Sequence, residues 1–394
     1  MKRVNEIVAV FRKYEIDYII EQSSFFKRLP FKKQKDEELD LDDSFEMRIR
    51  LSFEELGPTF IKLGQLLSTR PDLVGNDLAQ ELIKLQDNAP PISYETVKEI
   101  IESELDDDME NLFAEFDEEP IGSASIGQVH KAKLHNGKEV AVKVQKPNVE
   151  DVVDTDLDIM HFFAGRVNQF VRRSRVFNLP AIISEFERSI RMEIDYKYES
   201  SNISHLKNDF KHDKTVYVPD VYNRYTSSKV LTMEFINGKN VSEILENPEG
   251  YDLSLIAKRG LDSYIKQILF NGFFHADPHP GNIWIRNGRI VWLDLGMMGR
   301  LSGRDRAAIR KAVYSLAHHD TFEMKTAVLA LGIPRGRVNH TMLYQDIDVL
   351  MNQYSSMDFR SLQMGRLTHQ IMNILRVHHI AFPQGLSMFA RGVL

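Results

Sequence analysis

Three polar residues in one segment have the types and the spacing that phosphoryl transfer requires. Asp277 is followed by Asn282, and Asp294 ends an apolar run just before Leu295-Gly296. This chemistry needs a carboxylate that orients or deprotonates the nucleophile, and hard oxygen ligands that hold Mg²⁺ against phosphates. Asp277 suits the first role, and Asn282 and Asp294 suit the second. A single Asp or Asn in a loop usually forms a turn, but the ordered set predicts a Mg²⁺-dependent phosphate site.

A lysine on a predicted strand could complete this site. In the run KEVAVKVQ, alternate residues share one face of a strand. Val140, Val142 and Val144 are therefore expected to face a core, and Ala141 and Lys143 to lie together on the other face. A small Ala beside a Lys leaves room for adenine and places an ammonium group near the phosphates. A strand lysine taken alone is usually a solvated charge, so the prediction depends on the downstream Asp/Asn/Asp set.

A loop that could contact phosphates precedes the lysine strand. The sequence PIGSASIGQVH stands where a G-x-G-x-x-G loop would be expected, and side chains replace part of the glycine spacing. A tight turn with exposed backbone N–H groups remains feasible, although the added side chains should stiffen it and crowd the phosphates. The predicted phosphate contacts are Gly122, Ser123, Ala124, Ser125 and Gly127.

Periodicity and turn signals indicate the elements that must position these residues. Helical spacing recurs over residues 45–115, 150–175, 180–208 and 251–394. Asn136-Gly137 and Asn287-Gly288 each separate two short runs, which indicates two β-hairpins. The order predicts an α+β, bilobal protein-kinase-like fold with a small antiparallel sheet in its first lobe and a helical second lobe. The expected divisions are a helical extension over 1–110, an N-terminal lobe over 111–236 and a C-terminal lobe over 237–394.

Composition narrows the functional classes. The net charge of −7 argues against a nucleic-acid binder, and the absence of cysteine excludes disulfides, thiolate zinc sites and cysteine nucleophiles. Neither a signal peptide nor an apolar run long enough to span a membrane is present. The apolar, cationic segment 1–22 predicts a helix that lies on a membrane surface or packs on its own domain or a partner. Because the chain ends within an apolar pattern, we expect the natural protein to continue.

Six motifs together resemble the UbiB or AarF-domain family of atypical kinases. They are KLGQ (62–65), SASIGQVH (123–130), VAVK (140–143), EIDY (193–196), HADPHPGN (275–282) and LDLG (293–296). The resemblance covers roughly residues 45–300. It implies an ATP-binding, Mg²⁺-dependent kinase-like enzyme whose N-terminal KxGQ helix folds over the active site.

The resemblance also implies roles for particular residues. Lys143 would be the ATP lysine, Asp277 the catalytic-loop aspartate, and Asn282 and Asp294 the metal ligands, while Glu234 is a further expected cofactor contact. The lysine needs a carboxylate partner on a helix. Periodicity alone does not choose among Glu185, Glu187, Glu193 and Asp195. The resemblance points to Glu187. It also implies that Lys62 and Gln65, together with Glu193 and Asp195, occlude the place where a protein substrate would bind.

Three functions remain open at this stage. The first is an ATPase or small-molecule phosphotransferase that supports isoprenoid quinone or other lipid metabolism at a membrane; the lipid part comes only from the resemblance. The second is a nucleotide-gated binding module without turnover, and the third is an ordinary Ser/Thr kinase, which the altered phosphate loop disfavours. The expected cofactors are ATP and Mg²⁺, and the expected partner is a lipid or a quinone-pathway complex. The expected location is the cytoplasmic face of a membrane, with this chain itself soluble.

Overall fold

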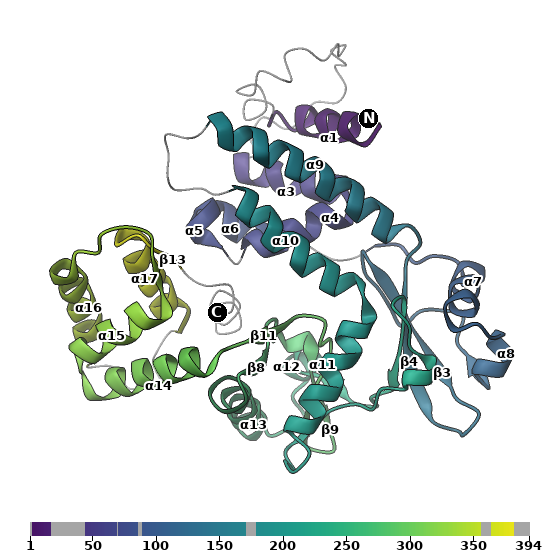
Figure 1. Ribbon diagram of the computed structural model, residues 1–394. Helices are drawn as coiled ribbons and strands as arrows, with labels where there is room; N and C mark the ends of the chain where they lie inside the picture. The colour runs from purple at the N-terminus through teal and green to yellow at the C-terminus, as the bar shows by residue number, and fades with distance from the viewer. Residues whose placement is uncertain are drawn as a thin grey trace. The chain divides into compact units, whose positions relative to one another are not determined.

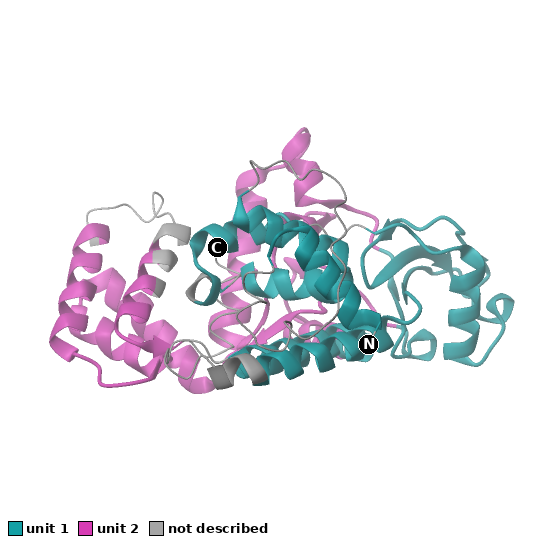
Figure 2. Cartoon of the chain, turned by 90° about the horizontal axis from the view of Figure 1, so that it is seen from above, with its two compact units in different colours: residues 1–198, 222–235 teal, residues 199–221, 236–394 magenta. Residues whose placement is uncertain are grey.

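The computed structural model of the chain describes residues 2–16, 44–68, 70–85, 89–170, 179–355 and 364–381. The chain forms two compact units, which Figure 2 colours separately. Unit 1 comprises residues 1–198 and 222–235, and unit 2 comprises residues 199–221 and 236–394. The predicted helical extension and most of the predicted first lobe fall in unit 1, whereas residues 199–221 of that lobe belong to unit 2. The divisions expected at residues 110 and 236 stay predictions.

A group of packed helices forms one part of unit 1 (Figure 1). They are α1 (Lys2–Lys13), α3 (Phe45–Leu56), α4 (Pro58–Ser68), α5 (Pro71–Val74), α6 (Asn76–Leu82), α9 (Val149–Phe170) and α10 (Leu179–Ile194). Apolar residues recur at helical spacing, and their shared face becomes the core. Phe53, Phe60, Leu63, Leu157 and Phe186 are all buried in this one cluster.

The glycine of the KLGQ motif is explained by close packing. A Cβ atom at Gly64 would lie 2.2 Å from Leu85 Cδ1 and 2.9 Å from Phe53 Cδ2. Real Cβ atoms do not approach carbon so closely, because van der Waals contact begins well beyond 3 Å, at about 3.5–4 Å. Gly64 therefore permits α4 to lie against its neighbours, and its place in the motif is structural.

Helix α1 packs on the rest of unit 1, as one of the alternatives for the segment 1–22 expected, and the membrane-surface alternative stays a prediction. Ile7, Val8 and Val10 are buried. Arg3 donates from Nε to Asp156 Oδ1 over 2.7 Å and from Nη2 to the Leu56 main-chain oxygen over 2.7 Å. The Asp156 carboxylate is fully buried, and a buried carboxylate needs such a partner. This ion pair joins α1 to α9 and to the end of α3.

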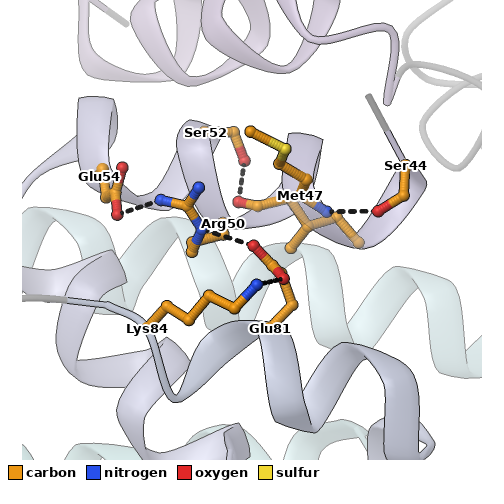
Figure 3. A network of polar contacts seen from close by, with 8 residues as sticks. Ser44, Met47, Arg50, Ser52, Glu54, Glu81 and Lys84 are labelled. Carbon is orange, nitrogen blue, oxygen red and sulfur yellow. Dashed lines mark hydrogen bonds and ion pairs between the residues drawn. The ribbon is translucent and has the colours of Figure 1, made fainter. Parts of the chain in front are cut away.

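A second polar contact joins α3 to α6 (Figure 3). Arg50 donates to Glu81 over 2.8 Å and to Glu54 over 2.7 Å, and Lys84 also pairs with Glu81. These cations hold the pKa of Glu81 below its usual value, with the hydrogen bond from Lys84 as the largest cause. One carboxylate thus connects two helices that are separated in the sequence by α4 and α5.

The other part of unit 1 is a small antiparallel sheet, as predicted. Its strands are β1 (Glu115–Phe116), β2 (Gly122–Ser123), β3 (Gly127–Lys133), β4 (Glu139–Gln145) and β6 (Val230–Glu234). They pair in the order β1-β3-β4-β6, with β2 also on β3. Helices α7 (Tyr94–Leu105) and α8 (Met109–Leu112) share a buried core with Val140, Val142 and Val144. The predicted inward face of the lysine strand is confirmed.

Unit 2 begins within α11 (Tyr196–Asp209) and contains the elements around the predicted catalytic loop. Its helix α13 (Leu253–Ile265) continues into a π-helical turn, Lys266–Asn271, and then into strand β8 (Phe273–His275). Strand β8 pairs with β11 (Met298–Arg300). A four-stranded sheet has the order β5-β10-β9-β7. Its strands are β5 (Val216–Tyr217), β10 (Arg289–Trp292), β9 (Ile283–Arg286) and β7 (Lys239–Asn240), and α12 (Val241–Glu246) follows.

The predicted hairpin in unit 2 is confirmed, together with its turn. Strands β9 and β10 pair antiparallel, with Arg286 opposite Arg289 beside the turn. Asn287 and Gly288 have φ values of 51° and 72°. Both central residues of a type I′ turn need positive φ, and Asn-Gly is the pair that adopts it most easily.

The remainder of unit 2 is mainly helical. It contains α14 (Gly303–His318), α15 (Thr321–Leu331), α16 (His340–Ser355) and α17 (Met364–Val377), with a short pair of strands, β12 (Ile333–Pro334) and β13 (Ile380–Ala381). Apolar residues of α15, α16 and α17 share a core. Among the residues described, no helix has the length and apolar character needed to cross a membrane. The last residues, 382–394, on which the expected continuation depends, lie outside the described part.

Candidate functional site

The segment between β8 and β9 folds into a compact loop that carries two predicted site residues. The main-chain oxygen of Asp277 accepts hydrogen bonds from His279 N over 2.9 Å and from Asn282 Nδ2 over 3.2 Å. Asn282 N donates to the main-chain oxygen of His279 over 2.9 Å. Because the side-chain nitrogen Nδ2 of Asn282 donates inside the loop, Oδ1 is the atom of this side chain that could serve as the predicted metal ligand.

The second residue predicted to bind metal is brought to this loop by main-chain bonds. Leu293 N donates to the main-chain oxygen of Asn282 over 3.0 Å, and Asp294 follows immediately. Ala276 N donates to the main-chain oxygen of Met297 over 3.0 Å, on the other side of Asp294. Asp294 has a φ of 53°, a left-handed conformation that aspartate adopts uncommonly and that is often retained at functional sites. Carboxylate and amide oxygens of this kind fit Mg²⁺ when phosphates supply the remaining ligands.

His275 links the two motifs, and sequence reasoning missed it. Its side chain is completely buried. Nε2 donates to the main-chain oxygen of Leu293 over 3.0 Å, and Nδ1 accepts from Asp277 N over 3.1 Å. This pattern requires the neutral ring, and burial lowers the pKa of His275 accordingly. One imidazole therefore holds the residue before Asp294 against the backbone of Asp277.

Two side chains of one helical segment hold His275 in turn. Gln267 Oε1 accepts from His275 N over 2.9 Å, and the Tyr264 hydroxyl donates to the His275 main-chain oxygen over 3.1 Å. Burial raises the pKa of Tyr264, and the Asp277 carboxylate adds to this shift. The phenol therefore stays protonated and remains a donor. Hydrophobic periodicity does not reveal that His275 is buried between the Asp277 loop and the strand before Asp294. For that reason the sequence did not suggest His275, Gln267 or Tyr264.

Helix α11 contributes a buried carboxylate near the residues after Asp294. Asn202 Nδ2 donates to the Leu295 main-chain oxygen over 2.9 Å. Glu199 is only 4% exposed, and its Oε2 lies 3.8 Å from the position that a Cβ atom at Gly296 would take. A carboxylate is rarely buried without a specific purpose. Glu199 is thus a candidate site residue that the sequence did not suggest.

The strand lysine and its neighbours lie in unit 1. Lys143 is half-buried on the face of β4 opposite the valine core, and Ala141 is buried beside it. In the sheet register, Lys143 stands opposite Val129 of β3 and Leu231 of β6, and Glu234 stands opposite Val140. The central strand of the sheet therefore presents Ala141 and Lys143 together, in the arrangement predicted for nucleotide binding.

The altered phosphate loop is anchored by its side chains. Ser123 Oγ donates to the Ala89 main-chain oxygen over 2.8 Å, and Ala124 N donates to the Gly127 oxygen over 2.8 Å. Ile126 is buried in the same core as the α4 residues Phe60 and Leu63. The expected stiffening of this loop therefore has a concrete basis. Whether Gly122, Ser123, Ala124, Ser125 and Gly127 contact phosphate stays a prediction.

The end of the SASIGQVH motif is structural. A Cβ atom at Gly127 would lie 2.2 Å from the Tyr196 hydroxyl, so this glycine allows a close approach. Gln128 Oε1 accepts from Ile92 N over 2.8 Å, and its Nε2 donates to His130 Nε2 over 2.8 Å. Both side chains are buried, and burial lowers the pKa of His130. The pair fixes the segment before α7 to the sheet.

The KxGQ and EIDY motifs meet in unit 1. Lys62 of α4 forms an ion pair with Glu193 of α10, and both side chains are largely buried. Asp195 accepts instead from Lys197 N over 3.0 Å. Gln65 lies on α4, where it is half-buried. Two of the four residues expected to occlude a substrate site thus contact each other, and the occlusion itself stays a prediction.

Glu187 has partners other than a strand lysine. Its carboxylate contacts His161 Nε2 at 2.8 Å and Arg191 Nε at 3.0 Å, and Arg191 also pairs with Asp154. The hydrogen bond with His161 is the largest cause of its lowered pKa. Helix α10 thus directs Glu187 toward α9. The role that the resemblance assigned to Glu187 stays a prediction.

We expect the two glutamates to differ when each is replaced by Gln. Glu199→Gln should weaken Mg²⁺-ATP binding at least about tenfold, because it removes a buried charge close to the residues that follow Asp294. Glu187→Gln is the matched control, and it should change affinity less than about twofold because exposed ion pairs contribute little. Isothermal titration measures the affinity of both variants for Mg²⁺-ATP. Equal affinities in the two variants would contradict a special role of Glu199 in nucleotide binding.

Comparison with known proteins points to the same family as the sequence motifs. The ABC1 atypical kinase-like domain matches residues 84–328. A probable protein kinase UbiB from Marinobacter nauticus is 33% identical over 355 residues, covering 86% of this chain and 64% of that protein. The chloroplast protein activity of bc1 complex kinase 8 from Arabidopsis thaliana is 39% identical over 284 residues, covering 71% of this chain and 37% of that protein. The chain therefore spans less than two thirds of the length of each relative.

A solved structure supports the fold. The complex of Rv3197 with erythromycin from Mycobacterium tuberculosis has a TM-score of 0.54 and 25% sequence identity, with 84% of this chain and 92% of that chain covered. The predicted α+β, kinase-like fold is therefore confirmed. With HADPHPGN, LDLG, VAVK and KLGQ each placed on the expected elements, the chain belongs to the family of ABC1 atypical kinase-like, or UbiB, proteins.

Proposed function

We propose that this protein binds ATP with Mg²⁺ and consumes it as an atypical phosphotransferase or ATPase. The observation that carries the proposal is the His275 linkage, which holds the Asp277 loop and the residue before Asp294 in one rigid arrangement. A scaffold that only needed to fold would have no reason to bury a neutral imidazole between two acidic motifs.

The residues divide into roles that their positions support. Asn282 Oδ1 and the Asp294 carboxylate would hold Mg²⁺, which supplies neutralising charge to the phosphates when bound. Asp277 would orient the attacking hydroxyl or water and accept its proton at the carboxylate. Lys143 would contact phosphate oxygens, while Ala141 leaves room for the base. Backbone N–H groups of the anchored loop would contact the phosphates that remain.

The anchored loop and the Lys62–Glu193 pair favour a small acceptor over a protein side chain. Ile126 is buried against the KxGQ helix, so the loop cannot move away from α4 without exposing apolar surface. We therefore expect water or a small molecule to be the phosphate acceptor. A role in isoprenoid quinone or related lipid metabolism at a membrane rests on the family resemblance alone.

A thermal-shift titration followed by a turnover assay tests the proposal. Mg²⁺-ATP should raise the melting temperature of the full chain, with a smaller rise when Mg²⁺ is chelated, because bound ligand stabilises only the folded state. Purified protein should then release phosphate from ATP in a Mg²⁺-dependent way. No shift with Mg²⁺-ATP at millimolar concentration would reject nucleotide binding altogether.

A second candidate is a nucleotide-gated binding module without turnover. The loop anchored through Ser123 and the ion pair of Lys62 with Glu193 favour this candidate. The two candidates differ at Asp277. For an enzyme, Asp277→Asn should abolish phosphate release and leave the thermal shift intact. For a binding module, the wild type and Asp277→Asn should hydrolyse ATP equally slowly.

A further inference from the structure

A short proline-containing segment of unit 1 is bonded to both ends of the predicted phosphate loop. This segment, the strap, consists of residues 89–92 and precedes α7. Ser123 Oγ, near the start of the loop, donates to the Ala89 main-chain oxygen over 2.8 Å. Gln128 follows the loop directly; its Oε1 accepts from Ile92 N over 2.8 Å and its Nε2 donates to the Ile92 oxygen over 3.3 Å. The strap therefore spans the loop from its beginning to its end.

A further contact comes from the residue that follows β4. Lys146 Nζ donates to the Pro90 main-chain oxygen over 2.9 Å, and Lys146 N donates to the Ile126 main-chain oxygen over 2.8 Å. One residue thus contacts the strap with its side chain and the loop with its backbone. Together with the bonds at Ala89 and Ile92, this contact joins the strap to the strands on either side of the loop.

The side chain of Gln128 is held in one orientation. It is 1% exposed, and the neighbouring His130 is fully buried. His130 Nδ1 lies 2.8 Å from the main-chain oxygen of Asp117, which can only accept, so Nδ1 carries the ring proton. Burial lowers the pKa of His130, and the neutral ring therefore accepts at Nε2 from Gln128 Nε2 over 2.8 Å. This fixes the Gln128 amide with Oε1 toward the N–H of Ile92.

The two prolines restrict the strap before any contact forms. Proline holds φ near about −65°, and a residue that precedes proline is confined to extended conformations. Ala89 and Pro90 each precede a proline. Neither Pro90 nor Pro91 has an N–H group, so the bonds of the strap use the oxygens of Ala89 and Pro90 and both backbone groups of Ile92. A preformed segment loses less conformational entropy when it is bound than a flexible one does.

The loop is also fixed by apolar packing, in the same part of unit 1 from which the strap comes. Ile126 of the loop, Leu63 of α4 and Leu85, which lies shortly before the strap, are buried in one cluster. Displacing the loop would therefore break its bonds to the strap and expose apolar surface at Ile126. A loop held in this way keeps its backbone N–H groups in place, and a preorganised site loses less entropy when a ligand binds.

We propose that the strap positions the phosphate loop for nucleotide binding and that Gln128 is the positioning residue that joins the two. This inference rests on the proposed function. Backbone N–H groups of the loop that contact phosphates would do so both before and during transfer. Their displacement weakens the binding of substrate and transition state alike, which raises KM and leaves kcat nearly unchanged.

Hydrogen exchange of the full chain without nucleotide tests whether the strap holds the loop. Gln128→Met keeps the side-chain length and removes the partners of Ile92. Pro90→Gly/Pro91→Gly changes two exposed residues and frees the backbone of the strap, so it tests the strap without disturbing the core. In both variants, the amides of Ile92 and Lys146 should exchange at least about fivefold faster than in the wild type, because local opening is easier.

Ser93→Ala is the matched control. Ser93 follows the strap directly, and its Oγ accepts from Thr96 N over 3.3 Å as the N-cap of α7. Its replacement perturbs the start of the helix and leaves every contact between strap and loop in place. The exchange rates at Ile92 and Lys146 should therefore equal those of the wild type.

Calorimetric titration with Mg²⁺-ATP and steady-state phosphate release then test the positioning role. Affinity should fall, and KM should rise, at least about fivefold in Gln128→Met and about twofold in the proline variant, with kcat within about twofold of the wild type. Unchanged exchange in both variants, or faster exchange with wild-type affinity, would reject the positioning role alone. A wild type that does not bind Mg²⁺-ATP would reject the proposed function, and the positioning role with it.

Discussion

Replacing Asp294 with Asn should lower Mg²⁺-dependent ATP turnover by at least about a thousandfold, because a metal ion at a transferring phosphate supplies several kcal/mol of charge stabilisation. Asn keeps the shape of the side chain and tolerates the left-handed region well. The φ of 53° at this position is therefore compatible with the variant, and the substitution tests the charge and not the backbone.

The matched control for this variant is Asp262→Asn. Asp262 lies on α13 in the same unit, where it is exposed, and within the described part of the chain its carboxylate pairs with Lys258 alone, at 3.6 Å. Its loss should leave both turnover and melting temperature unchanged, because exposed helix ion pairs contribute little. Steady-state phosphate release over a range of Mg²⁺ concentrations measures both variants. Turnover in Asp294→Asn within a few-fold of the wild type would remove Asp294 from the metal site.

Replacing His275 with Leu should destabilise the protein by up to about 6 kcal/mol, because it removes the partners of the partly buried Leu293 oxygen and Asp277 N–H, and each group left unsatisfied costs up to about 3 kcal/mol. Turnover should fall with it, since the Asp277 loop loses its connection to Asp294. His275→Asn, which offers one donor and one acceptor, is the conservative control and should retain part of the stability. Chemical denaturation measures these differences, and equal stability of His275→Leu and the wild type would contradict the linkage.

The same histidine predicts a dependence of stability on pH. Burial lowers the pKa of His275 in the folded state, so at pH values below the unfolded-state pKa of about 6.5 the unfolded chain binds more protons. The contribution of His275 to the stability of the folded state is present above that pH and is lost as the pH falls toward the folded-state pKa. His130, whose pKa is also lowered by burial, acts in the same direction. As the pH falls, the melting temperature of His275→Leu should therefore decrease less steeply than that of the wild type, but it should still decrease.

Several features could be predicted from sequence because their causes are local. Alternating valines predicted the inner face of the Lys143 strand, and Asn287-Gly288 predicted a hairpin turn, since both depend on backbone geometry within a few residues. The order of Asp277, Asn282 and Asp294 along one loop and one hairpin predicted that they belong together. The main-chain bond from Leu293 to Asn282 joins that loop to the strand before Asp294.

The choice among helix carboxylates required the tertiary structure. A helix repeats every 3.6 residues, so several glutamates of the segment 185–199 satisfy the same spacing. Only packing shows that Glu187 contacts His161 and Arg191, that Glu193 pairs with Lys62, and that Glu199 is buried. Burial depends on elements far away in the sequence, which no local pattern records.

By itself, the sequence predicted which residues of this protein would hold phosphate and metal, because those side-chain types and intervals are set along a single stretch of chain. Only the tertiary structure decided how they are held. His275 acquires its role from two backbone groups on different segments, and Gly64 from the side chains of Leu85 and Phe53. The physical reason is that hydrogen bonding and close packing in a buried site depend on three-dimensional neighbours, which the order of residues does not specify directly.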